Sequence, residues 1–206
     1  MAEGLEVADL SFRYPRSKTA VLGDIRFRIG SGVNAAIVGP NGSGKSTLLN
    51  LLSGLFVPAT GSITIDGVHV GSVKESIATV GNTSELFDYL TAEENSRFVN
   101  RFLGLSWNPV DFSELIERYG LRAHEHERIA NLSRGTRKKV QMVVALMTNP
   151  RMVLADEPLD GLDAAGIEAW SDDCRRFNSG GGIVLSALHD KGYVSANCSA
   201  VVELGN

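Results

Sequence analysis

A glycine-rich run, Gly39-Pro40-Asn41-Gly42-Ser43-Gly44-Lys45-Ser46-Thr47, constrains the fold of this chain more than any other feature. It follows an apolar segment, Val33–Val38, which predicts a buried strand. It runs into a segment with helical spacing of leucines, Ser46–Leu55. A strand, a glycine-rich loop and a helix in that order are the setting of a phosphate-binding P-loop. A turn without function can match the same spacing, but the flanking strand and helix favour the P-loop.

Each residue type in this loop has a physical task in holding a nucleoside triphosphate. Glycines let the backbone bend so that several N–H groups point at the phosphates, and the helix that follows adds the partial positive charge of its N-terminus. Lys45 is expected to reach the β- and γ-phosphates, and the Ser46 hydroxyl to bind Mg²⁺. We therefore predict a site for ATP and Mg²⁺ with nucleotide contacts from Gly39, Pro40, Asn41, Gly42, Ser43, Gly44, Lys45, Ser46 and Thr47.

Two carboxylates, Asp156 and Glu157, come directly after a second buried strand, Met152–Ala155. A carboxylate at the end of a strand beside the P-loop can hold Mg²⁺ through its water shell, which makes Asp156 a metal candidate. Glu157 is expected to be the general base or to position the attacking water, a role that contributes typically about 10²–10⁴-fold in rate. Taken alone, the pair also fits a polar strand-to-loop corner, and the complete P-loop favours the catalytic role.

The order of elements predicts an α/β fold with a mainly parallel sheet. Further strands are predicted at Leu5–Phe12, Ile25–Ile29, Ser62–Ile65, Ile77–Val80 and Gly182–Leu188. Helix-compatible runs dominate from about Thr91 to Thr148, with a break at Trp107-Asn108-Pro109. We predict one domain over residues 1–206, with a P-loop core and a small N-terminal antiparallel β part at about 1–87 and 149–206, and an inserted helical subdomain at about 88–148.

Composition narrows the possible partners and the location. A net charge of −4 and a pI of about 5.6 give no basic surplus, so no nucleic-acid partner is expected. The two cysteines, Cys174 and Cys198, match no metal-ligand spacing and indicate reduced thiols. No secretion signal is evident at the start, and no apolar run approaches the roughly 20 residues that span a bilayer. A cytoplasmic protein is expected, and any membrane role would come through a partner.

Further motifs resemble those of ATP-binding cassette (ABC) ATPases. Leu132-Ser133-Arg134-Gly135-Thr136 resembles the family's signature sequence, Leu-Ser-Gly-Gly-Gln, and lies shortly before the acidic pair. Asp160-Gly161-Leu162-Asp163 looks like the family's D-loop, and His189, after an apolar strand, like its switch histidine. Tyr14 looks like the aromatic residue that stacks on adenine. The resemblance runs from about Leu5 to Leu204, with the motifs in the family's order.

The resemblance implies a dimer that sandwiches two ATP molecules, in which Ser133 and Gly135 of one subunit contact the γ-phosphate bound by the other. Ser133 is also well placed to cap a helix that starts near Gly135, and a helix N-terminus stabilises an anion. By resemblance, His189 contacts the γ-phosphate and holds the attacking water. From the residues alone, an ordinary helix cap, a satisfied histidine and a packed Tyr14 are the alternatives.

Three positions depart from the family's pattern. Asn82 stands where the family has a glutamine that binds Mg²⁺ and senses the membrane partner. Asparagine keeps the amide oxygen but is one methylene shorter, so Asn82 is either a metal ligand or a plain loop residue. Arg134 replaces the first glycine of the signature, and Thr136 replaces its glutamine. Since Ser133 and Gly135 are kept, phosphate recognition is expected to persist.

The function implied by resemblance is that of a subunit that binds and hydrolyses ATP to power a transporter. Its partners would be a separate transmembrane permease, which holds it at the cytoplasmic face, and a second ATP-binding subunit in a homodimer or heterodimer. The Leu-Ser-Arg-Gly form of the signature looks most like that of exporter ATPases. One alternative is a soluble ABC ATPase that remodels a cytosolic complex such as an iron–sulfur assembly scaffold. Another is a nucleotide-binding module without turnover, against which Glu157 and His189 argue.

Overall fold

The computed structural model describes residues 4–81 and 86–205, and four of its strands form an antiparallel sheet. Their order in the sheet is β2-β1-β4-β5, with bounds Leu22–Gly30 (β2), Gly4–Phe12 (β1), Thr60–Ile65 (β4) and Val68–His69 (β5). Burial alternates along much of β1, as expected for a strand with one face on the core and one toward solvent.

A parallel sheet of five strands carries the site. Its order is β6-β7-β8-β3-β9, with bounds Ile77–Val80 (β6), Met152–Asp156 (β7), Ile183–Ala187 (β8), Asn34–Val38 (β3) and Ala200–Glu203 (β9). Every residue of β7 and β8 is buried. Helices and a second sheet cover both faces of a sheet of this type, so its central strands are apolar without alternation. The predicted mainly parallel sheet is confirmed.

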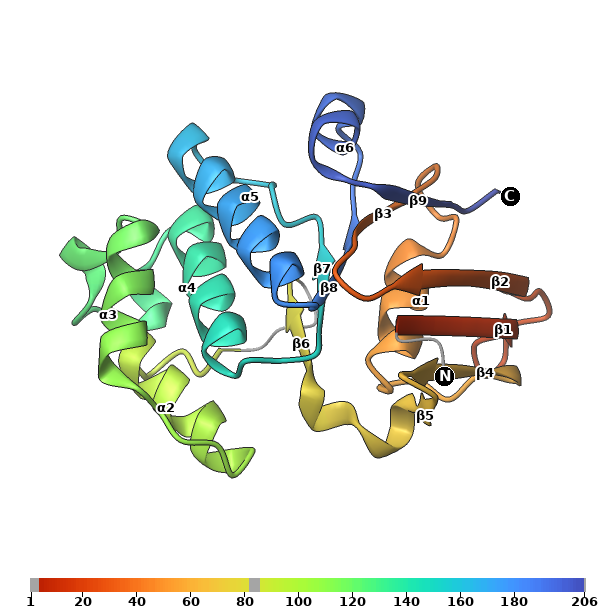
Figure 1. Cartoon of the computed structure of the whole chain (residues 1–206), viewed down its shortest axis with the longest axis horizontal. Coiled ribbons are helices and arrows are strands. Elements are labelled where there is room, and N and C mark those ends of the chain that lie inside the picture. The colour runs from red at the N-terminus through yellow and green to blue at the C-terminus, as the bar shows by residue number, and fades with distance from the viewer. Residues whose placement is uncertain (1–3, 82–85, 206) are drawn as a thin grey trace.

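Six α-helices within the described residues complete the fold: α1 (Lys45–Leu52), α2 (Ala92–Phe102), α3 (Pro109–Arg118), α4 (Arg134–Met147), α5 (Ala164–Ser179) and α6 (Lys191–Asn197). Figure 1 shows α2 and α3 at one end of the molecule and the antiparallel sheet at the other, with the parallel sheet between them. Local signals set the helix starts: Thr91 and Glu94 form a capping box on α2, and the Asn108 side chain caps α3 ahead of Pro109.

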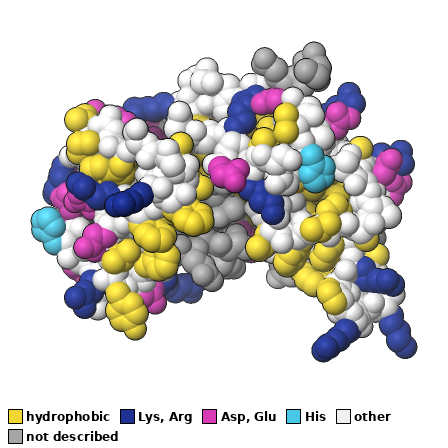
Figure 2. Space-filling view, turned by 90° about the horizontal axis from the view of Figure 1, so that it is seen from below, with side chains coloured by type: hydrophobic (Ala, Val, Ile, Leu, Met, Phe, Trp, Pro, Cys, Tyr) yellow, Lys and Arg dark blue, Asp and Glu magenta, His cyan; other side chains and the backbone are white. Residues whose placement is uncertain are grey.

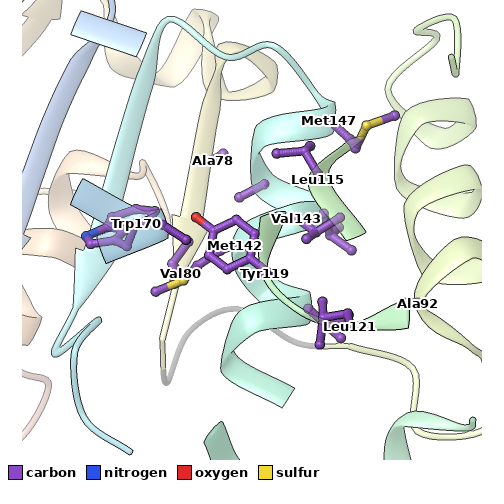
Figure 3. Close-up of a cluster of buried hydrophobic side chains, with 14 of the residues drawn as sticks. Ala78, Val80, Ala92, Leu115, Tyr119, Leu121, Met142, Val143, Met147 and Trp170 are labelled. Carbon is purple, nitrogen blue, oxygen red and sulfur yellow. The ribbon is translucent and has the colours of Figure 1, made fainter. Parts of the chain in front are cut away.

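Two apolar cores lie on opposite faces of the parallel sheet. Along β7, Val153 and Ala155 join the core built with α2 to α5, whereas Met152 and Leu154 join the core built with α1 and the antiparallel sheet. Successive side chains of a strand point to opposite faces, so one strand serves both cores. In Figure 3, Trp170 is among the side chains of the first core. The ends of β7 and β8 are therefore held rigidly from both sides.

The predicted fold class is confirmed, and some details differ from the prediction. Helix α1 ends at Leu52 rather than Leu55, because Gly54 follows in the left-handed region with φ 71°. The short elements β5, α6 and β9 have no counterpart among the predicted segments. The division into a core and a subdomain at about residue 88 stays a prediction. No helix in the described ranges is long and apolar enough to cross a membrane.

An ion pair joins the antiparallel sheet to the base of the parallel sheet. The guanidinium of Arg151, just before β7, donates to both oxygens of Asp66, at 2.6 and 3.0 Å, and the Gly4 N–H donates to the same carboxylate at 2.7 Å. The hydrogen bond from Arg151 holds the pKa of Asp66 below its usual value. Asp66 also has a φ of 51°, which asparagine tolerates as well as aspartate does.

Asp66→Asn is expected to lower the free energy of unfolding by roughly 1 kcal/mol at pH 7, because it removes the charge and keeps the backbone conformation. A lowered folded-state pKa gives stability that is fully present above the unfolded pKa and is lost as pH falls through the folded value. In urea denaturation series, the difference in the free energy of unfolding between variant and wild type should therefore shrink below about pH 4. A difference that stays constant down to pH 3 would mean that the Asp66 charge is not its source.

Candidate nucleotide-binding site

The glycine-rich loop joins β3 to α1 and is shaped by its own backbone. Gly44 caps α1 with φ 95°, and a Cβ there would lie 2.8 Å from the Leu22 side chain, so a larger residue would be strained and crowded. The Lys45 ammonium, on a residue only 7% exposed, donates to the carbonyl oxygens of Gly39 at 2.9 Å and Pro40 at 3.1 Å. The loop thus closes around its lysine.

Two polar groups in the loop fit an anionic ligand. Lys45 forms no ion pair among the described residues, and its two hydrogen-bond acceptors are neutral carbonyls. The Ser43 hydroxyl is buried and has no hydrogen-bond partner within the same residues. A buried group without a partner costs free energy, and a phosphate oxygen could satisfy both. The donor set at this loop therefore fits the phosphates of a nucleotide.

A cavity of about 410 Å³ opens over the loop. It is lined by Tyr14, Val21, Asn41, Gly42, Gly44, Lys45, Ser46, Thr47 and Glu157. Tyr14 stands in an aromatic group with Phe12 and Phe56, and its hydroxyl lies 3.0 Å from that of Thr47. The ring is therefore held by packing while 39% of the residue stays exposed. The sequence did not indicate Val21, which lies in an ordinary loop segment.

The acidic pair lies where β7 ends, beside the loop. Asp156 is the last residue of β7 and is 6% exposed, while Glu157 turns out of the strand with φ 49° and reaches the cavity. Oε1 of Glu157 lies 3.0 Å from Nε2 of His189, which follows β8. The structure thus brings Glu157 and His189, 32 residues apart, to the mouth of the P-loop.

The end of β6 also reaches this site. A Cβ on Gly81 would lie 2.5 Å from the Asp156 carbonyl oxygen, so the two backbones are in direct contact. Gln141 on α4 donates to the Gly81 carbonyl at 3.2 Å. The next residue, Asn82, lies outside the described residues, and its proposed role as a metal ligand stays a prediction.

The signature-like segment begins α4, with Ser133 as its N-cap. The Ser133 hydroxyl accepts from the Thr136 N–H at 3.1 Å, which confirms the predicted capping. A Cβ on Gly135 would lie 2.3 Å from the Gly161 carbonyl oxygen, so only glycine allows this approach. Neither Ser133 nor Gly135 is among the described residues that line the cavity. In one copy of the chain, the helix start therefore does not line the cavity over its own P-loop.

Three basic residues that follow the signature on α4 have partners within the protein. Arg137 pairs with Asp88 at 2.6 Å, and Lys139 pairs with Asp163 at 2.8 Å. Lys138 donates to the Glu157 carbonyl oxygen at 2.8 Å. Sequence patterns gave no signal for this last contact, because it joins a helix side chain to a main-chain atom 19 residues away.

Comparisons with known proteins agree with this geometry. The protein-family model described as "ABC transporter" matches residues 22–160 of this chain. The chain is 30% identical over 207 residues to the ABC transporter ATP-binding protein NatA of Bacillus subtilis (strain 168), covering 96% of this chain and 84% of that protein. It is 34% identical over 178 residues to the cytochrome c biogenesis ATP-binding export protein CcmA of Rhodopseudomonas palustris (strain BisB5), covering 86% of this chain and 88% of the relative.

A solved structure is similar over nearly the whole chain. It is described as the ATP binding subunit of an ABC transporter, and it superposes with a TM-score of 0.88 at 30% sequence identity. The match covers 98% of this chain and 85% of the other. Together with the P-loop, the acidic pair and the signature-like helix start, these matches show that the chain belongs to the ABC transporter family, among its ATP-binding subunits.

Proposed function

We propose that this chain binds ATP with Mg²⁺, hydrolyses it to ADP and phosphate, and works as a dimer with ATP at the interface. One observation carries the proposal: Glu157 and the P-loop share one cavity, with His189 against Glu157, while Ser133 lies on an exposed helix start outside it. A second copy or a related subunit can bring its Ser133 to that cavity, since a helix N-terminus stabilises an anion.

Each side chain has a defined part in this proposal. Lys45 exchanges its two carbonyl acceptors for the β- and γ-phosphate oxygens, and Tyr14 offers its ring to the adenine. Glu157 takes a proton from the attacking water, and His189, 3.0 Å from Glu157, orients that water and the γ-phosphate. Ser46 and Asp156 would hold Mg²⁺, with Asn82 as a further candidate ligand. When bound, Mg²⁺ supplies positive charge to the phosphoryl oxygens as charge builds there.

Mixing two inactive variants tests the proposed dimer. Lys45→Ala and Ser133→Ala are each expected to lose most hydrolysis. An equimolar mixture should recover part of it, because a mixed dimer contains one site with an intact P-loop and an intact Ser133. Hydrolysis is measured as phosphate release. As a control, the double variant mixed with Lys45→Ala should stay inactive, since every P-loop in that mixture lacks Lys45. An active Ser133→Ala, or no recovery on mixing, would contradict action in trans.

An exposed apolar surface supports a protein partner. It is formed by Phe87, Phe98 and Phe102, and the exposed Tyr89 and Leu105 are close to them in sequence. Tyr89 is 82% and Phe102 78% exposed. Phe98 contacts Phe87 edge-on at 4.7 Å between ring centroids and stacks on Phe102 at 6.4 Å. Figure 2 shows hydrophobic side chains gathered on the helical half of the face seen from below Figure 1. Exposed apolar groups of this kind mark interaction sites.

We propose that this surface binds a separate transmembrane permease, which places the chain at the cytoplasmic face of a membrane. Membership of a family of transporter ATP-binding subunits supports this partner. The word "export" in the name of the relative CcmA supports outward transport, which we propose as the direction.

A further inference from the structure

The main chain of Glu157 adopts a conformation that needs support. With φ 49°, Glu157 is in the left-handed region, which is unfavourable for a residue with a side chain. Such a conformation persists only when neighbouring groups fix it. The direction in which the carboxylate leaves the end of β7 depends on this backbone, so the groups that fix it also aim the carboxylate.

Within the described residues, three hydrogen bonds hold the Glu157 main chain. Its N–H donates to the Ala187 carbonyl at 3.2 Å, and its carbonyl accepts from the Asp160 N–H at 3.2 Å. The third bond, from the Lys138 ammonium at 2.8 Å, is the shortest. In the described part of the chain, Lys138 is the only side chain that donates to this main chain. The other two bonds are between backbone groups, so any side chain could occupy those positions.

Lys138 is partly buried, and carboxylates lie near its ammonium. Burial lowers the pKa of the Lys138 ammonium, while the carboxylates of Asp160 and Glu157 act in the opposite direction. Lys138 is also three residues after Gly135, and residues at this spacing are neighbours on a helix surface. The same side of α4 thus contacts the chain at both Glu157 and Gly161.

We propose that Lys138 is a positioning residue for hydrolysis, whose ammonium holds the Glu157 peptide so that the carboxylate faces the attacking water. This inference rests on the proposed role of Glu157 as the base. Lys138 lies on the same helix as Ser133, which we expect to contact the ATP bound by the other subunit. Through its bond to Glu157, Lys138 connects that helix to the base that acts on the ATP bound by its own subunit. Lys138 therefore links the two nucleotide sites of the dimer.

Lys138→Met and Lys138→Arg test the inference in the full chain. Methionine keeps an unbranched stem and removes the donor, so kcat should fall about 10-fold with KM for ATP nearly unchanged. Arginine can still donate to the Glu157 carbonyl and should restore most of kcat. The matched control is Arg137→Met, which removes one positive charge from the same helix, at a residue that pairs with Asp88, and should leave kcat unchanged.

A double variant separates positioning from general support of the fold. If Lys138 acts through the Glu157 carboxylate, Lys138→Met should add no further loss in a Glu157→Gln background. If the wild type hydrolyses ATP and Lys138→Met is equally fast, the inference is overturned and the proposed function stays intact. A loss that also appears in the Glu157→Gln background, or that arginine does not restore, would overturn it as well. A wild type without any hydrolysis would overturn both.

Discussion

Lys45→Ala is expected to weaken ATP binding by about 100-fold or more, which corresponds to roughly 3 kcal/mol. The Lys45 ammonium is the one charged side chain that the P-loop itself contributes, and its two hydrogen-bond acceptors among the described residues are neutral carbonyls. The β- and γ-phosphates of ATP would accept charge-assisted hydrogen bonds from the Lys45 ammonium, and such bonds are stronger than bonds to carbonyls. Isothermal titration calorimetry with ATP and Mg²⁺ measures the change directly.

The control for this variant is the stability of the empty protein. Lys45 also donates to Gly39 and Pro40, so its removal loosens the loop that it closes. Thermal unfolding without nucleotide shows whether the variant stays folded at the temperature of the titration. If the folded variant binds ATP as tightly as the wild type, the site assignment is wrong.

Glu157→Gln is expected to lower kcat by about 10²–10⁴-fold while ATP still binds. Glutamine has the same shape and can accept from His189 Nε2, so the contact at 3.0 Å can be kept. It cannot take a proton from water at neutral pH. Bound ATP therefore stays intact, and the variant should persist as an ATP-bound dimer. Phosphate release measures the rate, and light scattering with ATP measures the mass in solution.

A second acidic residue provides the matched control. Asp172→Asn removes a carboxylate from the surface of α5, where it pairs with Arg175, and should leave hydrolysis and mass unchanged. Turnover at the wild-type rate in Glu157→Gln would place the base elsewhere. Lost turnover without an ATP-dependent dimer would contradict the proposed interface and would still agree with Glu157 as the base.

The parts of the fold that the sequence predicted well are those with strong local signals. The apolar strand before Gly39 and the apolar strand before Asp156 are both buried and neighbour the same central strand, β8. Parallel strands place their carboxyl ends at one edge of the sheet, so the loop and the acidic pair had to meet there. The cap at Ser133 is equally local, because its hydroxyl bonds within its own helix turn.

What the sequence did not predict depends on contacts between distant segments. The bond from Lys138 to Glu157 needs the crossing of α4 over the end of β7, and no periodic pattern specifies that crossing. The close approach of Gly135 to Gly161 has the same origin. The elements β5 and α6 span two and seven residues, too few for a periodic pattern to be distinctive. The roles of the site residues stay predictions until the variants are measured.

The contact between Gly135 and Gly161 explains how this chain can differ from the common signature at the two adjacent positions. It is made by main-chain atoms, with no space for a side chain at Gly135. The Arg134 side chain is 91% exposed and reaches outward to Asp160, and the Thr136 hydroxyl bonds that of Ser133 at 2.7 Å. Residues 134 and 136 can therefore differ from the common signature without displacing the start of α4. Residue 135 has to be glycine for the contact with Gly161 to form.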